Sequence, residues 1–409
     1  MVAEVTAVKK KEYKPLGLYI HIPFCKSKCV YCDFYSLPNA EEGMDRYTAA
    51  LCRQLAELAP RTQAHQVDTV YFGGGTPSYL GAKRLRQILK TVYKHYRLAK
   101  DAEITLEANP DSAGDWKNLR ALRRAGFNRI SLGVQSADDE QLKTLGRPHT
   151  FAQAQEAVAA ARKAKIKNVS LDLIYGLPGQ TMESWQDTVE KAAALGPEHL
   201  SCYGLKVEEG TPLWDMQGEL ALPDDDAQAD MYLWTVERMG ELGYRQYEIS
   251  NFAKPDYESR HNLKYWTLGE YAGFGPGAHS DLGGVRYAYV RDLRAYCEGV
   301  ETEGDILSEN DRIPDRDRDI EYIMLGLRTS KGLSRKEFEY RFRLPFGPIQ
   351  EVLERFAESG HAVLRGGRWR LTPEGFLVSN QIIGLCLEAL AGEKVRREEA
   401  AARHDYRVQ

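Results

Sequence analysis

The 409-residue chain has few cysteines, no long hydrophobic run and no large excess of charge of one sign. No apolar stretch approaches the roughly 18 residues that a membrane-spanning helix needs, so the sequence predicts no such helix. The first residues combine Glu4 with Lys9, Lys10 and Lys11 and lack an apolar core, and we therefore expect no secretory signal. The formal net charge of -4 provides no global basic field, so nucleic acid is not an expected partner.

Seven cysteines are a low number for a chain of this length. Three of them lie close together, at Cys25, Cys29 and Cys32. The other four are scattered, and we expect them to be small buried hydrophobic residues: Cys52, Cys202, Cys297 and Cys386. An odd number with one tight group argues against a disulfide framework and for a reducing compartment, so the expected location is cytoplasmic.

The three clustered cysteines have the spacing C-x3-C-x2-C. Thiolates this close in sequence can hold three irons of a cubane iron–sulfur cluster and leave the fourth iron open to a small molecule. A structural zinc site uses four Cys or His ligands and closes its coordination shell. His21 is a candidate fourth ligand, but it lies in an apolar run that indicates a strand. A zinc site or a redox switch stays the alternative interpretation of this motif.

Short apolar runs alternate with longer amphipathic ones through the first half of the chain. Strand–helix units in series form a parallel sheet with right-handed crossovers, so the predicted fold class is α/β, as a doubly wound sheet or a barrel. The predicted strands cover residues 16–24, 67–72, 103–107, 129–134, 168–174 and 200–205. Helices are predicted between them, for instance over residues 44–58, 82–96, 150–164 and 182–195.

Polar or glycine-rich residues follow five of these strands, always at the same end. They are Cys25, the run Gly73-Gly74-Gly75-Thr76-Pro77, Glu107 with Asn109, Gln135 with Ser136, and Asp172 with Tyr175. The carboxyl ends of parallel strands meet at one rim, which is where ligands of such sheets bind. Chance would distribute these residues between both ends, so we expect them to form one site.

The cysteine spacing and these rim residues resemble radical S-adenosylmethionine (SAM) proteins. The resemblance implies an open (β/α)6 partial barrel, a [4Fe-4S] cluster on the three clustered cysteines, and SAM bound beside it. Glycines at this position let the backbone approach the amino group of a ligand closely. SAM contacts are implied for Tyr19, Tyr31, Gly74, Gly75, Thr76, Glu107, Gln135, Arg147 and Asp172. A packing role for Tyr31 and a surface salt bridge for Arg147 stay open as alternatives.

Longer motifs are similar to the oxygen-independent coproporphyrinogen oxidase family. They are HIPFC at residues 21–25, GGGTP at 73–77, GVQS at 133–136, DLIYGLPGQ at 172–180 and EEGTP at 208–212. The family has an oxidase branch and a heme-chaperone branch. The oxidase carries C-x3-C-x2-C-x-C and a longer N-terminal arm, whereas Phe34 stands here in place of the fourth cysteine. Both departures match the chaperone branch, so we do not expect coproporphyrinogen dehydrogenase activity and assign no catalytic residue.

Residues 261–266 read H-N-x-x-Y-W, which resembles the heme-binding motif of the chaperone branch. Histidine is a common proximal ligand of heme iron, and aromatic rings offer flat apolar faces to a porphyrin. The resemblance implies heme binding by His261, Asn262, Tyr265 and Trp266, with His279 as a weaker second candidate. A hydrogen-bonded structural histidine is the alternative for His261.

Helical patterns followed by two short strands around Gly366 and Gly367 predict a small winged-helix-like α+β domain near the end of the chain. The expected organisation is an N-terminal arm (1–15), the barrel (16–243), an aromatic and glycine-rich segment with the H-N-x-x-Y-W motif (244–300), a linker (301–319), the winged-helix-like domain (320–384) and a charged tail (385–409). Acidic residues such as Glu337 offset the arginines of this domain, which disfavours nucleic-acid binding.

The leading hypothesis is a heme chaperone that binds heme and a SAM-coordinating [4Fe-4S] cluster and transfers heme to acceptor hemoproteins. Whether it also cleaves SAM is left open. The alternative is an oxygen-independent coproporphyrinogen III dehydrogenase, a radical SAM oxidative decarboxylase. The sequence also leaves open a homodimer and a transient association with a membrane.

Overall fold

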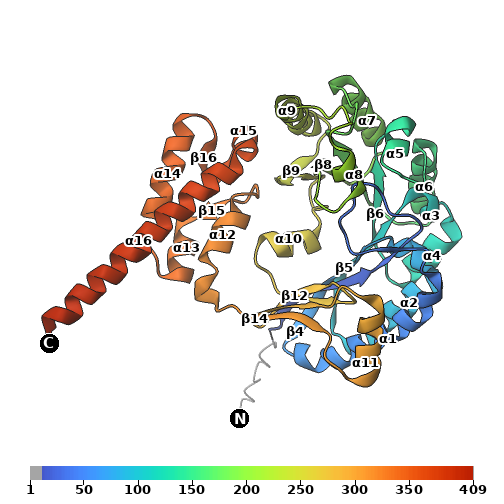
Figure 1. Cartoon of the computed structure of the whole chain (residues 1–409), viewed down its shortest axis with the longest axis horizontal. Helices are drawn as coiled ribbons and strands as arrows, with labels where there is room; N and C mark the ends of the chain where they lie inside the picture. The colour runs from blue at the N-terminus through green and yellow to red at the C-terminus, as the bar shows by residue number, and fades with distance from the viewer. Residues whose placement is uncertain (1–11, 409) are drawn as a thin grey trace, which may run out of the picture.

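The computed structural model describes residues 12–408, in which one large curved sheet carries helices on its convex side (Figure 1). Most of the expected N-terminal arm, including Lys9, Lys10 and Lys11, lies outside the described residues. The sheet has 12 strands in the order β14-β13-β12-β11-β1-β4-β5-β6-β7-β8-β10-β9. Its parallel core contains the six predicted strands, which are β1 (Lys14–Ile22), β4 (His65–Gly74), β5 (Leu98–Ala108), β6 (Arg129–Gln135), β7 (Asn168–Tyr175) and β8 (His199–Gly204).

The period-two geometry of a strand divides β1 between two environments. Leu18, Ile20 and Ile22 are fully buried in the main hydrophobic core. Tyr19 and His21 alternate with them and therefore face the concave side of the sheet. In the parallel register Tyr19 lies beside Tyr71 of β4, which places both rings on that same side. The concave side of the sheet thus receives polar and aromatic side chains.

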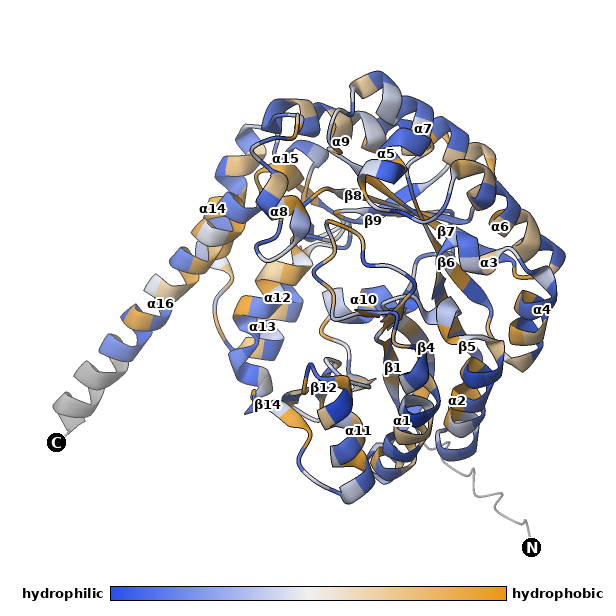
Figure 2. Cartoon of the chain, turned by 45° about the vertical axis from the view of Figure 1, so that its right-hand side comes forward, coloured by the Kyte–Doolittle hydropathy of each residue, from blue (hydrophilic) through white to orange (hydrophobic). Residues whose placement is uncertain are grey.

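Amphipathic helices cover the convex face and bury their apolar sides against the strands. Figure 2 shows hydrophobic residues on the strands and hydrophilic residues on the outer sides of these helices. The Thr150 side chain accepts from the Gln153 backbone in a capping box, which fixes where one of them begins. The covering helices include α1 (Met44–Leu58), α2 (Ala82–His95), α4 (Trp116–Ala125), α6 (Phe151–Lys163), α7 (Met182–Ala194) and α9 (Asp225–Glu241).

Segments that follow α9 extend the sheet at both edges and leave it open. One edge gains β10 (Asn251–Ala253) and β9 (Arg245–Glu248), which run antiparallel to their neighbours. At the other edge β11 (Tyr271–Phe274) pairs in parallel with β1, and an antiparallel meander follows through β12 (His279–Leu282) and β13 (Val285–Tyr289). The fold is therefore an open partial barrel with added edge strands, as the fold class anticipated.

Two expected boundaries differ from the structure. Residues 301–319, expected to be a linker, contain the edge strand β14 (Leu307–Arg312), which is exposed throughout and pairs with β13 through its backbone. Its polar sequence has no apolar alternation from which a strand could be predicted. The expected charged tail begins inside the long helix α16 (Ser379–Val408), where Cys386 and Leu390 are buried in the C-terminal core. The C-terminal domain therefore extends beyond residue 384.

The C-terminal domain has its own hydrophobic core, built around Phe338, Phe346 and Trp369. Its helices are α12 (Asp319–Gly326), α13 (Arg335–Phe342), α14 (Gly347–Glu358), α15 (Pro373–Leu377) and α16. A three-stranded sheet of β15 (Leu333–Ser334), β17 (Arg368–Leu371) and β16 (Ala362–Arg365) completes it, in a winged-helix-like arrangement. In Figure 1 this domain faces the open side of the curved sheet, and the short helix α10 (Arg260–Trp266) lies between them.

Smaller elements complete the described chain. The loop after β1 contains β2 (Phe24–Cys25) and β3 (Leu37–Pro38), which pair in parallel. The other short elements are η1 (Glu41–Gly43), η2 (Ala59–Thr62), η3 (Pro77–Leu80), α3 (Pro110–Ala113), α5 (Asp139–Thr144), α8 (Pro212–Met216), α11 (Leu293–Thr302) and η4 (Asp315–Asp317). The loop with β2 and β3 is the one that carries the three clustered cysteines.

Candidate functional site: a cysteine loop and a glycine loop at one rim

The cysteine loop lies at the carboxyl end of β1. Cys25 and Cys29 are buried and Cys32 is partly exposed, and all three thiols are free. The N–H of Cys32 donates to the carbonyl of Cys29 at 3.2 Å, which folds the end of the loop into a turn. Two side chains from other elements reach the sulfurs: Thr76 Oγ1 donates to Cys25 Sγ at 3.4 Å, and Arg147 Nη1 donates to Cys29 Sγ at 3.3 Å.

These surroundings fit an anionic iron–sulfur cluster. A hydroxyl and a guanidinium donate to sulfur, and both favour thiolate over thiol. Within residues 12–408 no three His, Cys, Asp or Glu side chains group closely enough to hold one metal ion. A cubane takes each thiolate on a different iron, so its ligands need not converge on one point. Gly75 supports the fit, because a Cβ there would lie 3.0 Å from Cys25 Sγ and 2.8 Å from the carbonyl oxygen of Phe24.

The glycine loop, residues 73–76, begins at the end of β4 and is fixed against the cysteine loop by backbone hydrogen bonds. The N–H of Gly75 donates to Ile22 at 2.8 Å, and that of Thr76 donates to Phe24 at 2.8 Å. Gly74 has a φ of 109°, and a Cβ at this residue would lie 2.5 Å from the ring of His21. Only glycine fits there. The sequence prediction placed Gly74, Gly75 and Thr76 beside the cysteines, and the structure brings them together.

Glu107 ends β5 next to the glycine loop. Its Oε1 accepts the hydroxyl of Tyr71 at 2.6 Å, and its Oε2 accepts the N–H of Gly74 at 3.2 Å. Burial raises the pKa of Glu107 to about 7, although the hydrogen bond from Tyr71 favours the carboxylate. The carboxyl group is therefore poised between its charged and neutral forms near neutral pH.

Arg147 comes from the loop after α5 and reaches across the rim. Its Nη2 donates to Asn109 Oδ1 at 2.6 Å and to the carbonyl of Gly133 at 2.8 Å. Its buried Nε has no hydrogen-bond partner among the described residues. The guanidinium is therefore part of the interior of the site, and the alternative of a surface salt bridge does not describe it.

Gln135 ends β6, whereas Asp172 lies within the neighbouring strand β7, three residues before its end and not at the strand end that the sequence analysis expected. Gln135 adopts a φ of 67°, which is uncommon for a non-glycine residue and turns the chain at the strand end. Asp172 accepts the hydroxyls of Ser131, at 3.0 Å, and Ser201, at 2.7 Å. Burial raises the pKa of Asp172, while these hydroxyls favour its charged form. Asp172 therefore lies deeper in the sheet than Gln135, between β6 and β8.

The two tyrosines with implied SAM contacts occupy different places. The hydroxyl of Tyr19 is hydrogen-bonded to His21 Nδ1 at 3.1 Å, below the glycine loop. Tyr31 packs, partly buried, against a small cluster that includes Leu145 and Leu177. Since Tyr31 lies between Cys29 and Cys32, it lines the cysteine loop, and its packing contact is present as well.

The four residues with an implied heme contact lie on α10, and the structure places His261 in the interior, with 1% of its surface exposed. Its Nδ1 is hydrogen-bonded to Thr69 Oγ1 at 2.8 Å and its Nε2 to the hydroxyl of Tyr265 at 2.9 Å. Asn262 Nδ2 donates to Tyr247 and Glu248, both at 3.3 Å. Both ring nitrogens of His261 are thus occupied in this conformation.

The other candidate residues of this region differ in exposure. Trp266 is partly buried, and its Nε1 has no hydrogen-bond partner within the part of the chain that the structure describes. His279 is exposed at the start of β12 and is not brought together with α10 by any hydrogen bond given for it. In this structure His261 thus has the buried, hydrogen-bonded environment that the sequence analysis left open as the alternative to heme binding, and we call this arrangement of α10 its closed position.

Tyr71 and Thr69, which connect α10 with the rim, were not among the predicted site residues. Both precede the glycine run on β4, at alternate positions that face the concave side. This alternation was a usable signal, because the buried residues Val70 and Phe72 fix the opposite face of the strand. The role of Glu103, which accepts the N–H groups of Arg260 and His261, depends on a contact across more than a hundred residues and leaves no local signal.

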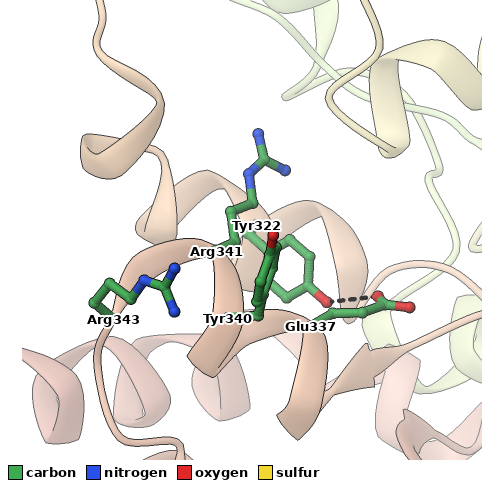
Figure 3. A pocket seen from close by; sticks show the side chains of 5 residues that line it. All are labelled: Tyr322, Glu337, Tyr340, Arg341 and Arg343. Carbon is green, nitrogen blue, oxygen red and sulfur yellow. Dashed lines mark hydrogen bonds between the residues drawn. The ribbon is translucent and has the colours of Figure 1, made fainter.

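A separate surface pocket of about 570 Å³ lies on the C-terminal domain (Figure 3). Tyr322 of α12 and Glu337 of α13 line it and share a hydrogen bond of 3.1 Å. Tyr340, Arg341 and Arg343 form its other side. None of the predicted site residues lines this pocket.

The structure contains no helix among its described residues that is long and apolar enough to cross a membrane.

Comparisons with known proteins agree with this geometry. Residues 19–192 match the model of the radical SAM superfamily, and residues 313–378 match the HemN C-terminal domain. The curated protein "Heme chaperone HemW" of Bacillus subtilis is 35% identical over 91% of this chain and 99% of its own length. The chain belongs to the HemW family of radical SAM proteins. A [4Fe-4S] cluster and SAM follow from that family.

Two further proteins are similar to this HemW-family chain, one by sequence and one by solved structure. The Escherichia coli protein "Heme chaperone HemW" is 37% identical over 91% of this chain and 98% of its own length. The solved structure of coproporphyrinogen III oxidase (HemN) from Escherichia coli, described as a radical SAM enzyme, has a TM-score of 0.80. It is 25% identical and covers 91% of this chain and 90% of its own. The HemW family and the oxidase therefore share one architecture.

Proposed function

We propose that this protein is a heme chaperone, which binds heme and a SAM-coordinating [4Fe-4S] cluster and passes heme to acceptor hemoproteins. The observation that carries the proposal is the similarity to curated heme chaperones along almost the whole chain, including the C-terminal domain. Phe34 supports it, because this exposed phenylalanine stands where the oxidase branch has a fourth cysteine. A homodimer, a transient membrane contact and a cytoplasmic location stay predictions.

Cys25, Cys29 and Cys32 would hold the cluster, and the rim beside them would hold SAM. When bound, the cluster supplies an iron with an open position that can hold the amino acid part of SAM and pass it an electron. The glycine loop offers backbone groups to the amino end of SAM, and Arg147 offers a guanidinium to its carboxylate. Glu107 offers a carboxyl group to the ribose hydroxyls. These residues bind and orient the ligand and exclude water from it.

We infer that heme binding by His261, Asn262, Tyr265 and Trp266 requires α10 to leave its closed position. Iron ligation by His261 needs a free ring nitrogen, and each is hydrogen-bonded here, to Thr69 and to Tyr265. α10 is only seven residues long, so its opening would break few backbone hydrogen bonds. Opening would expose the flat faces of Tyr265 and Trp266 to a porphyrin.

The oxidase reaction is the second candidate, and the architecture shared with HemN is the observation that favours it. Anaerobically reconstituted protein would be given hemin in one assay, and coproporphyrinogen III with SAM and a reductant in another. Stable heme uptake followed by transfer to an apo-hemoprotein, without decarboxylation, supports the chaperone. Formation of protoporphyrinogen IX would reject it in favour of the oxidase.

A further inference from the structure

Three aromatic rings lie nearly parallel on the concave side of the sheet, and we name them the ring cluster: Tyr19, Tyr71 and His261. The rings of Tyr71 and His261 have centroids 5.1 Å apart with an interplanar angle of 21°. Tyr19 lies 6.2 Å from Tyr71 and 6.4 Å from His261, at angles of 24° and 26°. The ring of His261 therefore packs directly on two tyrosines of the central strands.

The ring cluster is connected to the glycine loop through Glu107. The hydroxyl of Tyr71 donates to Glu107 Oε1 at 2.6 Å, and Glu107 Oε2 accepts the N–H of Gly74 at 3.2 Å. The orientation of the Tyr71 ring decides whether its hydroxyl can reach the carboxyl group. Whatever holds that ring in place therefore also holds Glu107 against Gly74.

A second connection runs from the ring cluster to the cysteine loop. The hydroxyl of Tyr19 is hydrogen-bonded to His21 Nδ1 at 3.1 Å, and His21 Nε2 is hydrogen-bonded to the carbonyl of Tyr35 at 2.9 Å. Tyr35 lies just after Cys32, and the ring of His21 packs under Gly74. Both loops of the rim thus rest on side chains that contact the ring cluster.

α10 is anchored in a way that fixes the ring of His261. Glu103 accepts the N–H of His261 at 3.1 Å and that of Arg260 at 3.2 Å, at the first turn of the helix. Lys264 forms an ion pair of 2.8 Å with Asp68 on β4. Both ring nitrogens of His261 are also hydrogen-bonded, which holds its ring in one orientation in the closed position.

We propose that His261 is a positioning residue for SAM binding, whose ring holds Tyr71 against Glu107 and thereby shapes the glycine loop. The inference rests on the proposed binding of SAM at residues 73–76 and Glu107. It gives the H-N-x-x-Y-W motif a role in the closed position of α10, in heme-free protein, that is separate from ligation of iron. The part of His261 that performs this role is the flat face of its ring, whereas ligation of iron would use a ring nitrogen.

This role differs from general packing of α10 in one measurable respect. Phenylalanine at residue 261 keeps a flat ring on Tyr71 but provides no nitrogen for iron. Alanine removes the ring and leaves Tyr71 unsupported. Lys264→Met provides a matched control on the same helix, because it removes one anchor of α10, the ion pair with Asp68, and leaves all three rings of the ring cluster in the chain.

The test measures SAM binding to reconstituted, heme-free protein by isothermal titration, with iron content and circular dichroism recorded for each variant. We expect His261→Ala to weaken SAM binding about five- to tenfold, which corresponds to the loss of about one hydrogen bond. His261→Phe and Lys264→Met should stay within about twofold of the wild type. Equal SAM affinity of His261→Ala and the wild type would overturn the proposal, and so would equal weakening in all three variants.

A second variant tests the same connection if His261→Ala does not fold. Tyr71→Phe removes the hydroxyl that reaches Glu107 and preserves the ring, and we expect it to weaken SAM binding to the same extent. Unchanged affinity in Tyr71→Phe would overturn the connection. Failure of the wild type itself to bind SAM would reject the proposed function instead, so the two failures are distinguishable.

Discussion

The guanidinium of Arg147 donates a hydrogen bond from Nη1 to the sulfur of Cys29 across 3.3 Å. The two residues lie on different strand–helix units, and the other guanidinium end is held by Asn109 and Gly133. A fixed cation at a cluster ligand stabilises the more negative, reduced form of a cluster. We therefore expect Arg147 to influence the reduction potential of a cluster held by Cys29, in addition to its proposed contact with SAM.

Arg147→Gln should lower the midpoint potential of the cluster by roughly 50 mV, because the positive charge beside Cys29 is lost. Arg147→Lys, which keeps the charge but not the fork of donors, should shift it less. A redox titration monitored by electron paramagnetic resonance measures both variants in the absence of SAM. A potential that stays constant or rises in Arg147→Gln would contradict the assigned contact.

Glu107→Ala should weaken SAM binding about tenfold, since it removes an acceptor for Gly74 and a candidate partner for ribose. Glu107→Gln keeps one carbonyl oxygen and should therefore lose less affinity for SAM than Glu107→Ala. Because burial raises the pKa of Glu107 to about 7, affinity in the wild type should change around neutral pH, and this change should disappear in Glu107→Gln. Titrations at several pH values check both points, and an unaltered pH profile in the variant would reject the role of the carboxyl group.

The buried His261 predicts a loss of stability on acidification. Burial lowers the pKa of His261 to about 3, with Lys264 and Arg129 adding to the effect, whereas an unfolded histidine titrates near about 6.5. The contribution of neutral His261 to the free energy of unfolding is therefore complete above about pH 6.5, and it is lost as the pH falls towards about 3. Between about pH 7 and pH 5 the free energy of unfolding of the wild type should fall by about 2 kcal/mol more than that of His261→Phe. Urea unfolding at both pH values tests this, and equal losses in the two proteins would refute it.

Heme ligation by His261 predicts a measurable opening of α10. The N–H groups of Arg260 and His261 are capped by Glu103 in the closed position, so they should exchange slowly in heme-free protein. Heme should accelerate exchange of this peptide in the wild type but not in His261→Phe. Hydrogen exchange followed by mass spectrometry measures both. Continued protection of α10 in a complex whose heme spectrum depends on His261 would show that no opening is needed.

The parallel strands and the rim could be predicted from the sequence because their signals are local. The apolar run around Leu18 and Ile20 is continuous, and the glycines that follow Phe72 mark a strand end directly. Cys25, Gly75 and Glu107 then meet because the carboxyl ends of parallel strands lie at one edge. The direction of the strands alone brings these three residues together, so no long-range side-chain contact had to be known to predict it.

Other features depend on contacts that the sequence does not display. β14 consists of exposed polar residues and is held by backbone pairing with β13 alone. The pairing of β11 with β1 joins segments far apart in the chain. The interior position of His261 arises because Glu103 caps α10 and the Thr69 hydroxyl is hydrogen-bonded to the ring of His261, and neither residue is near the motif in sequence. The motif alone therefore left a heme ligand and a hydrogen-bonded structural histidine both open for His261.

The central claim is that Cys25, Cys29 and Cys32 hold a cubane with one open iron. Mössbauer spectroscopy of protein purified without oxygen from cells grown on isotopically enriched iron tests it most directly. We expect the quadrupole doublet of a [4Fe-4S] cluster, with one iron site whose parameters change when SAM is added, and we expect this doublet to disappear in Cys29→Ala. Mononuclear iron alone, or zinc in its place, would show that these cysteines do not hold a cubane.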